Sequence, residues 1–253
     1  IIMGWLESFT LKDCINNGVV AGYGNYIGGI AGYNDNAVIS DCASYLSDYD
    51  NSIFDMVVSK WEATGDYAGG IAGYNNGKIT FSDQSEKITV KSVASIVVGN
   101  NYIGGIAGFN DVNGELDVHY TLIGGRIYAY GDCAGGAFGL NASTKTLVQE
   151  LTIKPQSVQG QYYVGGCIGA NVVNLQEDTE MSQIRTDNTL GKITGEAFVG
   201  GIVGYQRTYT ADQLNLSSDA PIREALEKNL GKAAPNGKML PGLDEDFVPY
   251  QAV

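Results

Sequence analysis

The feature that most constrains this 253-residue chain is a nine-residue phrase that occurs six times. The copies read YIGGIAGYN (26–34), YAGGIAGYN (67–75), YIGGIAGFN (102–110), CAGGAFGLN (133–141), YVGGCIGAN (163–171) and FVGGIVGYQ (198–206). The spacing between copies varies, but the phrase is retained. A repeated supersecondary unit buries its apolar face against its neighbours. We therefore expect equivalent positions of successive copies to lie on top of one another.

Three glycine columns run through the six copies. They comprise Gly28, Gly29 and Gly32; Gly69, Gly70 and Gly73; Gly104, Gly105 and Gly108; Gly135, Gly136 and Gly139; Gly165, Gly166 and Gly169; and Gly200, Gly201 and Gly204. Three glycines in so short a unit disfavour a helix, because each costs about 1 kcal/mol relative to alanine. Glycine suits a tight bend with positive φ, or a close approach to a neighbouring copy. We expect both uses here.

The phrase ends in an amide in every copy. The column is Asn34, Asn75, Asn110, Asn141 and Asn171, with Gln206 in the last copy. Stacked amides hydrogen-bond along an array, as asparagine ladders do in cross-β packing. The aromatic residues at the start of the phrase and before the amide are expected to stack in the same way. A nucleotide-binding loop is excluded, because no Lys-Ser or Lys-Thr follows the glycines and the phrase occurs six times.

These patterns predict an all-β fold, a repetitive β-solenoid resembling a parallel β-helix. The segments between phrases, such as GKITF from residue 77 and GELDVHY from residue 114, alternate apolar and polar residues as half-buried strands do. We assign 1–210 to the repeat domain and 211–253 to a C-terminal cap or linker. A short helix is expected at 217–231, with Pro221 in its first turn and Gly231 at its end.

Charge excludes several functional classes. The formal net charge is −13, from 15 basic and 28 acidic residues, so nucleic acid is not an expected partner. No run of eighteen apolar residues is present, so no membrane span is expected. The only histidine, His119, rules out His-pair metal sites and argues against a Ser-His-Asp triad. No cofactor is expected, and the sequence leaves calcium dependence open.

Cysteine usage is sparse, with four residues and no C-x-x-C spacing. Cys14 and Cys42 lie in similar text one repeat apart, which places them in one column of adjacent copies. Neighbouring strands lie about 4.8 Å apart, within the range that a disulfide spans. A Cys14–Cys42 disulfide is therefore one hypothesis, and two buried thiols are the other. Cys133 and Cys167 replace core residues and are expected to behave as small apolar side chains.

With its columns aligned, the sequence resembles the GLUG-repeat family of bacterial cell-surface proteins. The stretch YIGGIAGYNDNAVISDCASY (26–45) carries almost the whole family unit, and the resemblance covers about 11–206. It implies a secreted or wall-attached module, extracellular or at the cell surface, and carries over no catalytic residues. Leu11 to Gly18 is already in phase with later half-repeats, so we expect further repeats or domains of a longer parent chain.

The sequence favours a function as a non-catalytic adhesin or stalk that binds a host or matrix protein or glycan. The variable inserts at 43–64, 111–130 and 172–194 are the expected binding face, and 172–190 is interpreted as a surface excursion. One alternative is a carbohydrate-active enzyme, which needs paired carboxylates such as Asp117 and Asp132. Another is a glycan-binding module that uses exposed tyrosines of the inserts: Tyr45, Tyr49, Tyr120, Tyr128 and Tyr209.

Overall fold

Every secondary-structure element that the computed structural model describes is a β-strand, and every described strand pair is parallel. The described residues are 3–16, 18–22, 24–44, 56–59, 65–81, 91–119, 121–143, 145–149, 152–153, 157–174, 180–182, 185–186 and 191–209. The helix expected at 217–231 and the cap or linker at 211–253 lie outside them. An all-β fold is confirmed for the described residues, and the parallel sheets are compatible with a β-helix-like fold.

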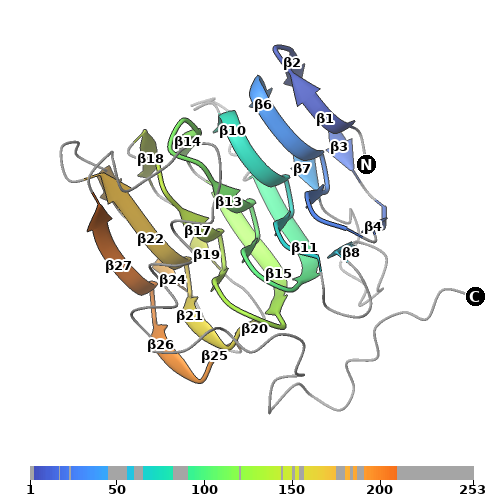
Figure 1. Ribbon diagram of the computed structural model, residues 1–253. Coiled ribbons are helices and arrows are strands. Elements are labelled where there is room, and N and C mark those ends of the chain that lie inside the picture. The colour runs from blue at the N-terminus through green and yellow to red at the C-terminus, as the bar shows by residue number, and fades with distance from the viewer. Residues whose placement is uncertain are drawn as a thin grey trace, which may run out of the picture.

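The largest sheet has eleven strands and carries the second half of the phrase (Figure 1). Its strands are β1 (Met3–Glu7), β2 (Thr10–Lys12), β6 (Ala31–Ser40), β10 (Ala72–Phe81), β13 (Ala107–Asn110), β14 (Glu115–His119), β17 (Phe138–Asn141), β18 (Thr146–Gln149), β22 (Ile168–Asn174), β23 (Glu180–Ser182) and β27 (Val203–Tyr209). Ala72 pairs with Ala31 on one side and with Ala107 on the other. The predicted alignment of the copies is therefore the hydrogen-bonding register of this sheet.

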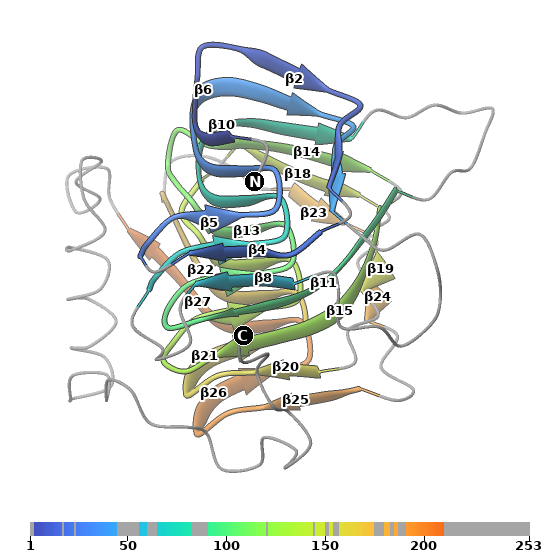
Figure 2. The ribbon, with the colours of Figure 1, turned by 90° about the vertical axis from the view of Figure 1, so that its right-hand side faces the viewer.

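A second sheet of eight strands is formed by the segments between phrases (Figure 2). It contains β4 (Val20–Gly22), β8 (Met56–Ser59), β11 (Lys91–Gly99), β15 (Thr121–Ala129), β19 (Thr152–Ile153), β20 (Ser157–Gln159), β24 (Arg185–Thr186) and β25 (Lys192–Thr194). Val97, for example, lies between Val57 and Ile127. The intervening segments therefore also pair copy by copy.

The first half of the phrase forms a six-stranded sheet of very short strands. They are β5 (Ile27–Gly28), β9 (Ala68–Gly69), β12 (Ile103–Gly104), β16 (Ala134–Gly135), β21 (Tyr162–Gly165) and β26 (Ala197–Gly200). A two-stranded sheet joins β3 (Ile15–Asn16) to β7 (Ala43–Ser44). Each phrase therefore contributes one strand to the six-stranded sheet, turns, and contributes the next strand to the eleven-stranded sheet.

The core lies between the sheets and follows the predicted apolar columns. Ile30, Ile71, Ile106, Ala137 and Cys167 occupy one column and have no exposed surface. A second apolar column contains Val20, Val97, Ile127 and Val158, all nearly or fully buried. Burying such a side chain contributes roughly 1.5–3 kcal/mol. Because the first column is buried in five successive copies, this stabilisation recurs along the array.

The inserts were expected to project, but wherever the structure describes them they form paired strands. This confirms the strand prediction for GELDVHY and contradicts the projection, whereas the binding role of the inserts stays a prediction. The stretch 111–130 supplies β14 and β15, and 172–194 supplies the end of β22 and the strands β23, β24 and β25. Of 43–64, the structure describes β7 and β8, both of which are also paired. A projecting excursion at these places would leave the edge of the neighbouring copy's strand without hydrogen-bond partners. The segments vary in sequence but remain strands.

Candidate functional site: the stacked phrase columns and a charged sheet face

The left-handed residue of each phrase is its first residue, which is aromatic in five copies and a cysteine in the fourth, and not one of its glycines. The φ values are 63° at Tyr26, 64° at Tyr67, 59° at Tyr102, 62° at Cys133, 58° at Tyr163 and 54° at Phe198. Among the described glycines only Gly125 has a positive φ. The expectation that the phrase glycines take positive φ was therefore wrong. A left-handed residue other than glycine costs about 1–2 kcal/mol.

Ring stacking offsets that cost. Tyr26, Tyr67 and Tyr102 stack at centroid distances of 5.0 and 5.2 Å. The second aromatic column stacks beside it, with Tyr33 on Tyr74 at 4.8 Å and Tyr74 on Phe109 at 5.0 Å. Rings of the two columns also meet edge to face. Because such aromatic pairs contribute about 0.5–1.5 kcal/mol each, the stacks hold the strained turns in place, as predicted for these tyrosines.

The glycine columns are explained by close approach. A Cβ on the first glycine would meet a carbonyl oxygen of its own turn: 1.9 Å from Ala31 O at Gly28, and 1.9 Å from Val203 O at Gly200. A Cβ on the second glycine would meet the following copy, 2.1 Å from Gly201 O at Gly166. A Cβ on the third would also meet the preceding copy, 2.7 Å from Gly32 O at Gly73. The repeat therefore needs glycine both for its own turn and for contact between copies.

The amide column forms an unbroken hydrogen-bonded ladder, as predicted. Each Nδ2 donates to the side-chain oxygen of the next copy, from Asn34 to Asn75 (2.7 Å), Asn75 to Asn110 (2.7 Å), Asn110 to Asn141 (2.8 Å), Asn141 to Asn171 (2.8 Å) and Asn171 to Gln206 (2.6 Å). The first four asparagines have no exposed surface. The ladder therefore runs in one direction through all six copies.

The ladder begins abruptly because a partial seventh copy precedes it. Met3, Trp5 and Leu6 pair with Ala31, Tyr33 and Asn34. Leu6 thus occupies the amide column, and its side chain has no N–H to donate, so Asn34 Oδ1 is buried without a hydrogen-bond donor. From the sequence, Leu11 to Gly18 was expected in phase with later half-repeats, but Gly4 and Trp5 were not recognised as members of the glycine and aromatic columns.

A second polar ladder was missed from the sequence. It lies one residue before the aromatic turn, where a side-chain oxygen accepts the main-chain N–H of the next copy: Asn25 from Asp66 (2.9 Å), Asp66 from Asn101 (3.1 Å), Asn101 from Asp132 (2.8 Å) and Asp132 from Tyr162 (3.3 Å). Asx side chains readily accept N–H bonds at turns. In the sequence, this ladder could have been found from the alternating Asn and Asp residues at the position directly before the phrase in the first four copies.

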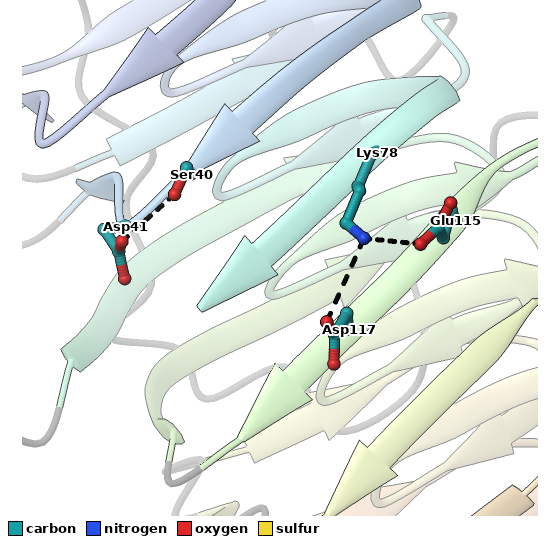
Figure 3. A network of polar contacts seen from close by, with 5 residues as sticks. All are labelled: Ser40, Asp41, Lys78, Glu115 and Asp117. Carbon is teal, nitrogen blue, oxygen red and sulfur yellow. Dashed lines mark hydrogen bonds and ion pairs between the residues drawn. The ribbon is translucent and has the colours of Figure 1, made fainter. Parts of the chain in front are cut away.

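The outer face of β10 and β14 carries a small charged network (Figure 3). Lys78 Nζ donates to Glu115 and lies 4.0 Å from Asp117 Oδ2. On β6, Ser40 donates to Asp41 at 3.0 Å. The inward residues of the same strands, Ile79 and Leu116, are buried. This alternation leaves the outer face free to vary in charge, because exposed ion pairs contribute at most about 1 kcal/mol to stability.

The Tyr74 hydroxyl donates to the buried carboxylate of Asp111 at 2.8 Å. Burial, followed by the proximity of Asp111, raises the pKa of Tyr74 well above its ordinary value of 10.0. Burial, followed by the charges of Asp35 and Asp111, raises the pKa of Tyr33 to about 12. Both hydroxyls therefore keep their protons at a pH where the unfolded tyrosines lose them.

We expect the folded chain to lose stability as pH rises above the ordinary tyrosine pKa, because the unfolded state then binds fewer protons than the native state. Tyr74→Phe removes one such proton. At neutral pH this variant should lose about 1–3 kcal/mol, the cost of removing one hydrogen bond to a buried carboxylate. The difference in unfolding free energy between this variant and wild type should shrink as pH rises. Urea unfolding on either side of pH 10 measures it. A constant difference would contradict the prediction; Phe109 in the same column shows that the bare ring fits.

Cys14 and Cys42 occupy neighbouring copies, as predicted, because Ile15 pairs with Ala43. Both are thiols in the structure, with Cys14 half-buried and Cys42 buried. Cys14 Sγ donates to Lys12 O, and Cys42 Sγ donates to Ser40 O, each at 3.3 Å. The disulfide between them remains a prediction. By contrast, complete burial raises the pKa of Cys167 to about 12.

We expect a mild oxidant such as oxidised glutathione to join Cys14 to Cys42 and to leave Cys167 a thiol. Strand spacing brings the first two within disulfide reach, whereas the Cys167 thiolate that would react is suppressed. Peptide mass mapping of folded chain, alkylated before and after reduction, measures both outcomes. Alkylation of Cys167 in the folded chain at neutral pH would contradict this, and chain unfolded before alkylation serves as the positive control.

The structure does not bring the candidate carboxylates and insert tyrosines together into one site. Asp117 lies on β14 beside Lys78, whereas Asp132 lies in the turn before β16, where it accepts the N–H of Tyr162. Tyr128 is 4% exposed and accepts a hydrogen bond from Ser157, so its expected exposure was wrong. Tyr45, Tyr49 and Tyr120 lie outside the described residues. His119 and Tyr209 lie in β14 and β27, and only their main chain is described.

Within the described ranges, the structure offers neither a metal-binding cluster nor a membrane-spanning helix. No three His, Cys, Asp or Glu side chains there gather closely enough to hold a metal ion. No described segment forms a helix of the length and apolarity that crossing a bilayer requires. In comparisons with known proteins, no family model, no curated protein and no solved structure matches this chain.

Proposed function

We propose that this chain is a repeat module of a bacterial cell-surface protein, in which the copies stack into a β-solenoid that serves as an adhesin or stalk. The single observation that carries the proposal is the amide ladder, which joins six copies in one direction. Such an array builds length by repetition of nearest-neighbour contacts. The residues of 26–45 that resemble the GLUG-repeat family support an extracellular or cell-surface location.

The binding face in this proposal is the outer surface of β6, β10 and β14. Equivalent outer positions differ from copy to copy, with Val38, Lys78 and Glu115 in one column. The inner positions of the same strands stay apolar and buried, with Ile39, Ile79 and Leu116 in the next column. A constant scaffold with variable outer side chains allows ligand contacts to change without disturbing the stack. The proposed ligand is a host or matrix protein or glycan.

No specific observation favours either of the two alternatives, a carbohydrate-active enzyme or a glycan-binding module. A carbohydrate-active enzyme would need two carboxylates facing one bond, and Asp117 and Asp132 lie on separate elements with separate partners. A glycan-binding module would need exposed insert tyrosines, and Tyr128 is buried. We therefore propose the non-catalytic role of an adhesin or stalk.

The test is binding of the purified chain to immobilised matrix proteins and to a glycan array, with and without calcium. For a ligand found in this way, Lys78→Gln and Asp117→Asn should weaken binding several-fold, since rim charges set orientation and encounter rate. Lys192→Gln, on β25 of another sheet, is the matched control and should leave binding unchanged. Binding that ignores the first two changes would remove the proposed face, and absence of any ligand would remove the adhesin role.

A further inference from the structure

Asparagine stands directly before glycine at two places in the described residues, at Asn76–Gly77 after the second phrase and at Asn113–Gly114 after the third. The array requires both glycines, because a Cβ would lie 2.4 Å from a main-chain oxygen of the preceding copy at Gly77 and 2.3 Å from Asn110 Oδ1 at Gly114. Glycine has no side chain to shield its main-chain nitrogen from the side-chain carbon of the asparagine before it. The packing of the copies therefore retains a chemically reactive pair in two successive copies.

The two pairs lie in different surroundings. Asn76 lies within β10, where its Nδ2 donates to Asp35 Oδ1 at 3.0 Å and its Oδ1 is buried. Asn113 is exposed and stands in a β-turn that is closed by the hydrogen bond from Gly114 N to Asp111 O at 2.8 Å. An exposed turn opens locally at a much lower free-energy cost than a paired strand. The side chain of Asn113 is therefore the one that can reach the main-chain nitrogen following it.

The reaction that this placement allows is deamidation through a five-membered ring. When the turn opens, Gly114 N gives up its proton to a base in the solvent and attacks Asn113 Cγ. The new bond from nitrogen to Cγ replaces the bond from Cγ to Nδ2, and Nδ2 takes a proton from the solvent and leaves as ammonia. Water then adds to either carbonyl of the ring, which gives aspartate or isoaspartate. Because the attack is intramolecular, the reacting groups are already held together.

The two products differ in the length of the main chain. Aspartate keeps the original main chain and adds one charge at an exposed position, where a charge contributes little to stability. In isoaspartate the main chain runs through the side-chain carbons, so the link at residue 113 is longer by a methylene group. The inner side of the turn has no room for that group, because a Cβ on Gly114 would also lie 2.6 Å from Asn75 O.

Both ends of the turn are held by β10. Before the turn, Asn110 pairs with Asn75 and accepts its side-chain N–H in the amide ladder. After the turn, Glu115 begins β14 and pairs with Lys78. A longer link between two fixed pairs displaces one of them, and the pair at the start of β14 is the one without a buried amide ladder. Isoaspartate at residue 113 is therefore expected to loosen β14 from β10.

We propose that Asn113 is a site of spontaneous deamidation in the folded chain, and that its isoaspartate product loosens the array at β14. The reaction needs only water and the chain itself. Asn76, in the equivalent dipeptide of the neighbouring copy, is protected by its strand. The proposal does not depend on the surface role proposed above, because it follows from the turn and its two neighbouring strands alone.

The first experiment is incubation of the full folded chain at neutral pH, followed by peptide mass mapping over time. Asn113 should convert about tenfold faster than Asn76 or more, since opening the strand breaks additional hydrogen bonds. In chain unfolded by urea, the two asparagines should convert at similar rates. Asn113→Gln is the control, because its longer side chain would have to close a larger ring, and no conversion should occur at that position. Folded chain in which Asn113 stays intact, or in which Asn76 converts as fast, overturns the proposal.

The second experiment separates the longer main chain from the added charge. The isoaspartate form is isolated from aged chain by ion exchange and compared with Asn113→Asp, which carries the same charge on an unchanged main chain. Amide hydrogen exchange in β14 should be about tenfold faster or more in the isoaspartate form, because local opening becomes easier. Exchange in Asn113→Asp should equal that of wild type. Wild-type exchange in the isoaspartate form, or equally fast exchange in both, overturns the inference that the product loosens the array.

Discussion

Alanine at Gly166 is expected to cost at least about 3 kcal/mol of unfolding free energy, beyond the usual range for overpacking, because the obstructing atoms are main chain. The new Cβ would lie 2.1 Å from Gly201 O and 2.9 Å from Ile193 Cδ1. The carbonyl belongs to the next copy and is fixed by its own strands. Only a local separation of the fifth and sixth copies relieves the overlap, and that separation breaks the bond from Gly166 N to Gly200 O.

The matched control is Gly201→Ala, the same position in the sixth copy. Its Cβ would meet nothing within 4 Å, so the change should stay within about 0.5 kcal/mol of wild type. Gly200→Ala separates the two uses of glycine, because its Cβ would lie 1.9 Å from Val203 O of its own turn and should be destabilising even in the last copy. Urea unfolding followed by circular dichroism ranks the three. Equal losses for Gly166→Ala and Gly201→Ala would show that the second glycine serves its own turn, not the contact between copies.

The repeated phrase correctly predicted those contacts that form between identical residues in register in successive copies. Asn34, Asn75 and Asn110 form the expected ladder, and Tyr26, Tyr67 and Tyr102 form the expected stack. Identity in one column is a sufficient signal, because parallel in-register pairing places like on like. An all-β fold with parallel strands follows from the same reasoning.

The errors arose where the residue type at a position does not reveal the backbone geometry required there. The turn at Tyr67 needs a left-handed residue, and the glycines beside it masked that need because glycine is the usual choice. The insert at 111–130 was expected to project although its alternating pattern predicted strands, and its first strand, β14, pairs with β10. The ladder from Asn25 through Asp132 uses two residue types whose side-chain oxygen performs one role. In these cases the residue types did not reveal the geometry that the copies share.

Removal of the amide at Asn110 is the second large effect. Asn110 is fully buried, accepts from Asn75 and donates to Asn141. Asn110→Ala deletes both bonds and leaves an Asn75 N–H buried without an acceptor. Each buried polar group left unsatisfied costs about 1–3 kcal/mol, and the space vacated by the side chain adds to the loss. We therefore expect a loss on the order of 3–5 kcal/mol, measured by urea unfolding. Gln206→Ala, at the exposed end of the same ladder, is the control and should lose no more than about 1 kcal/mol.

Asn110→Asp tests the direction of the ladder rather than its presence. An aspartate at this position still accepts from Asn75 but has no N–H to donate to Asn141 Oδ1, so two oxygens face each other in a buried place. Burial raises the pKa of that carboxyl above its unfolded value, and its stability penalty then grows as pH rises from the unfolded pKa through the folded one. Once protonated, the carboxyl donates an O–H to Asn141 and restores the ladder. Relative to wild type at the same pH, the variant should therefore be strongly destabilised at neutral pH and recover toward pH 4, near the ordinary aspartate pKa. A deficit that does not change with pH would mean that Asn110 fills space without relaying a hydrogen bond from one copy to the next.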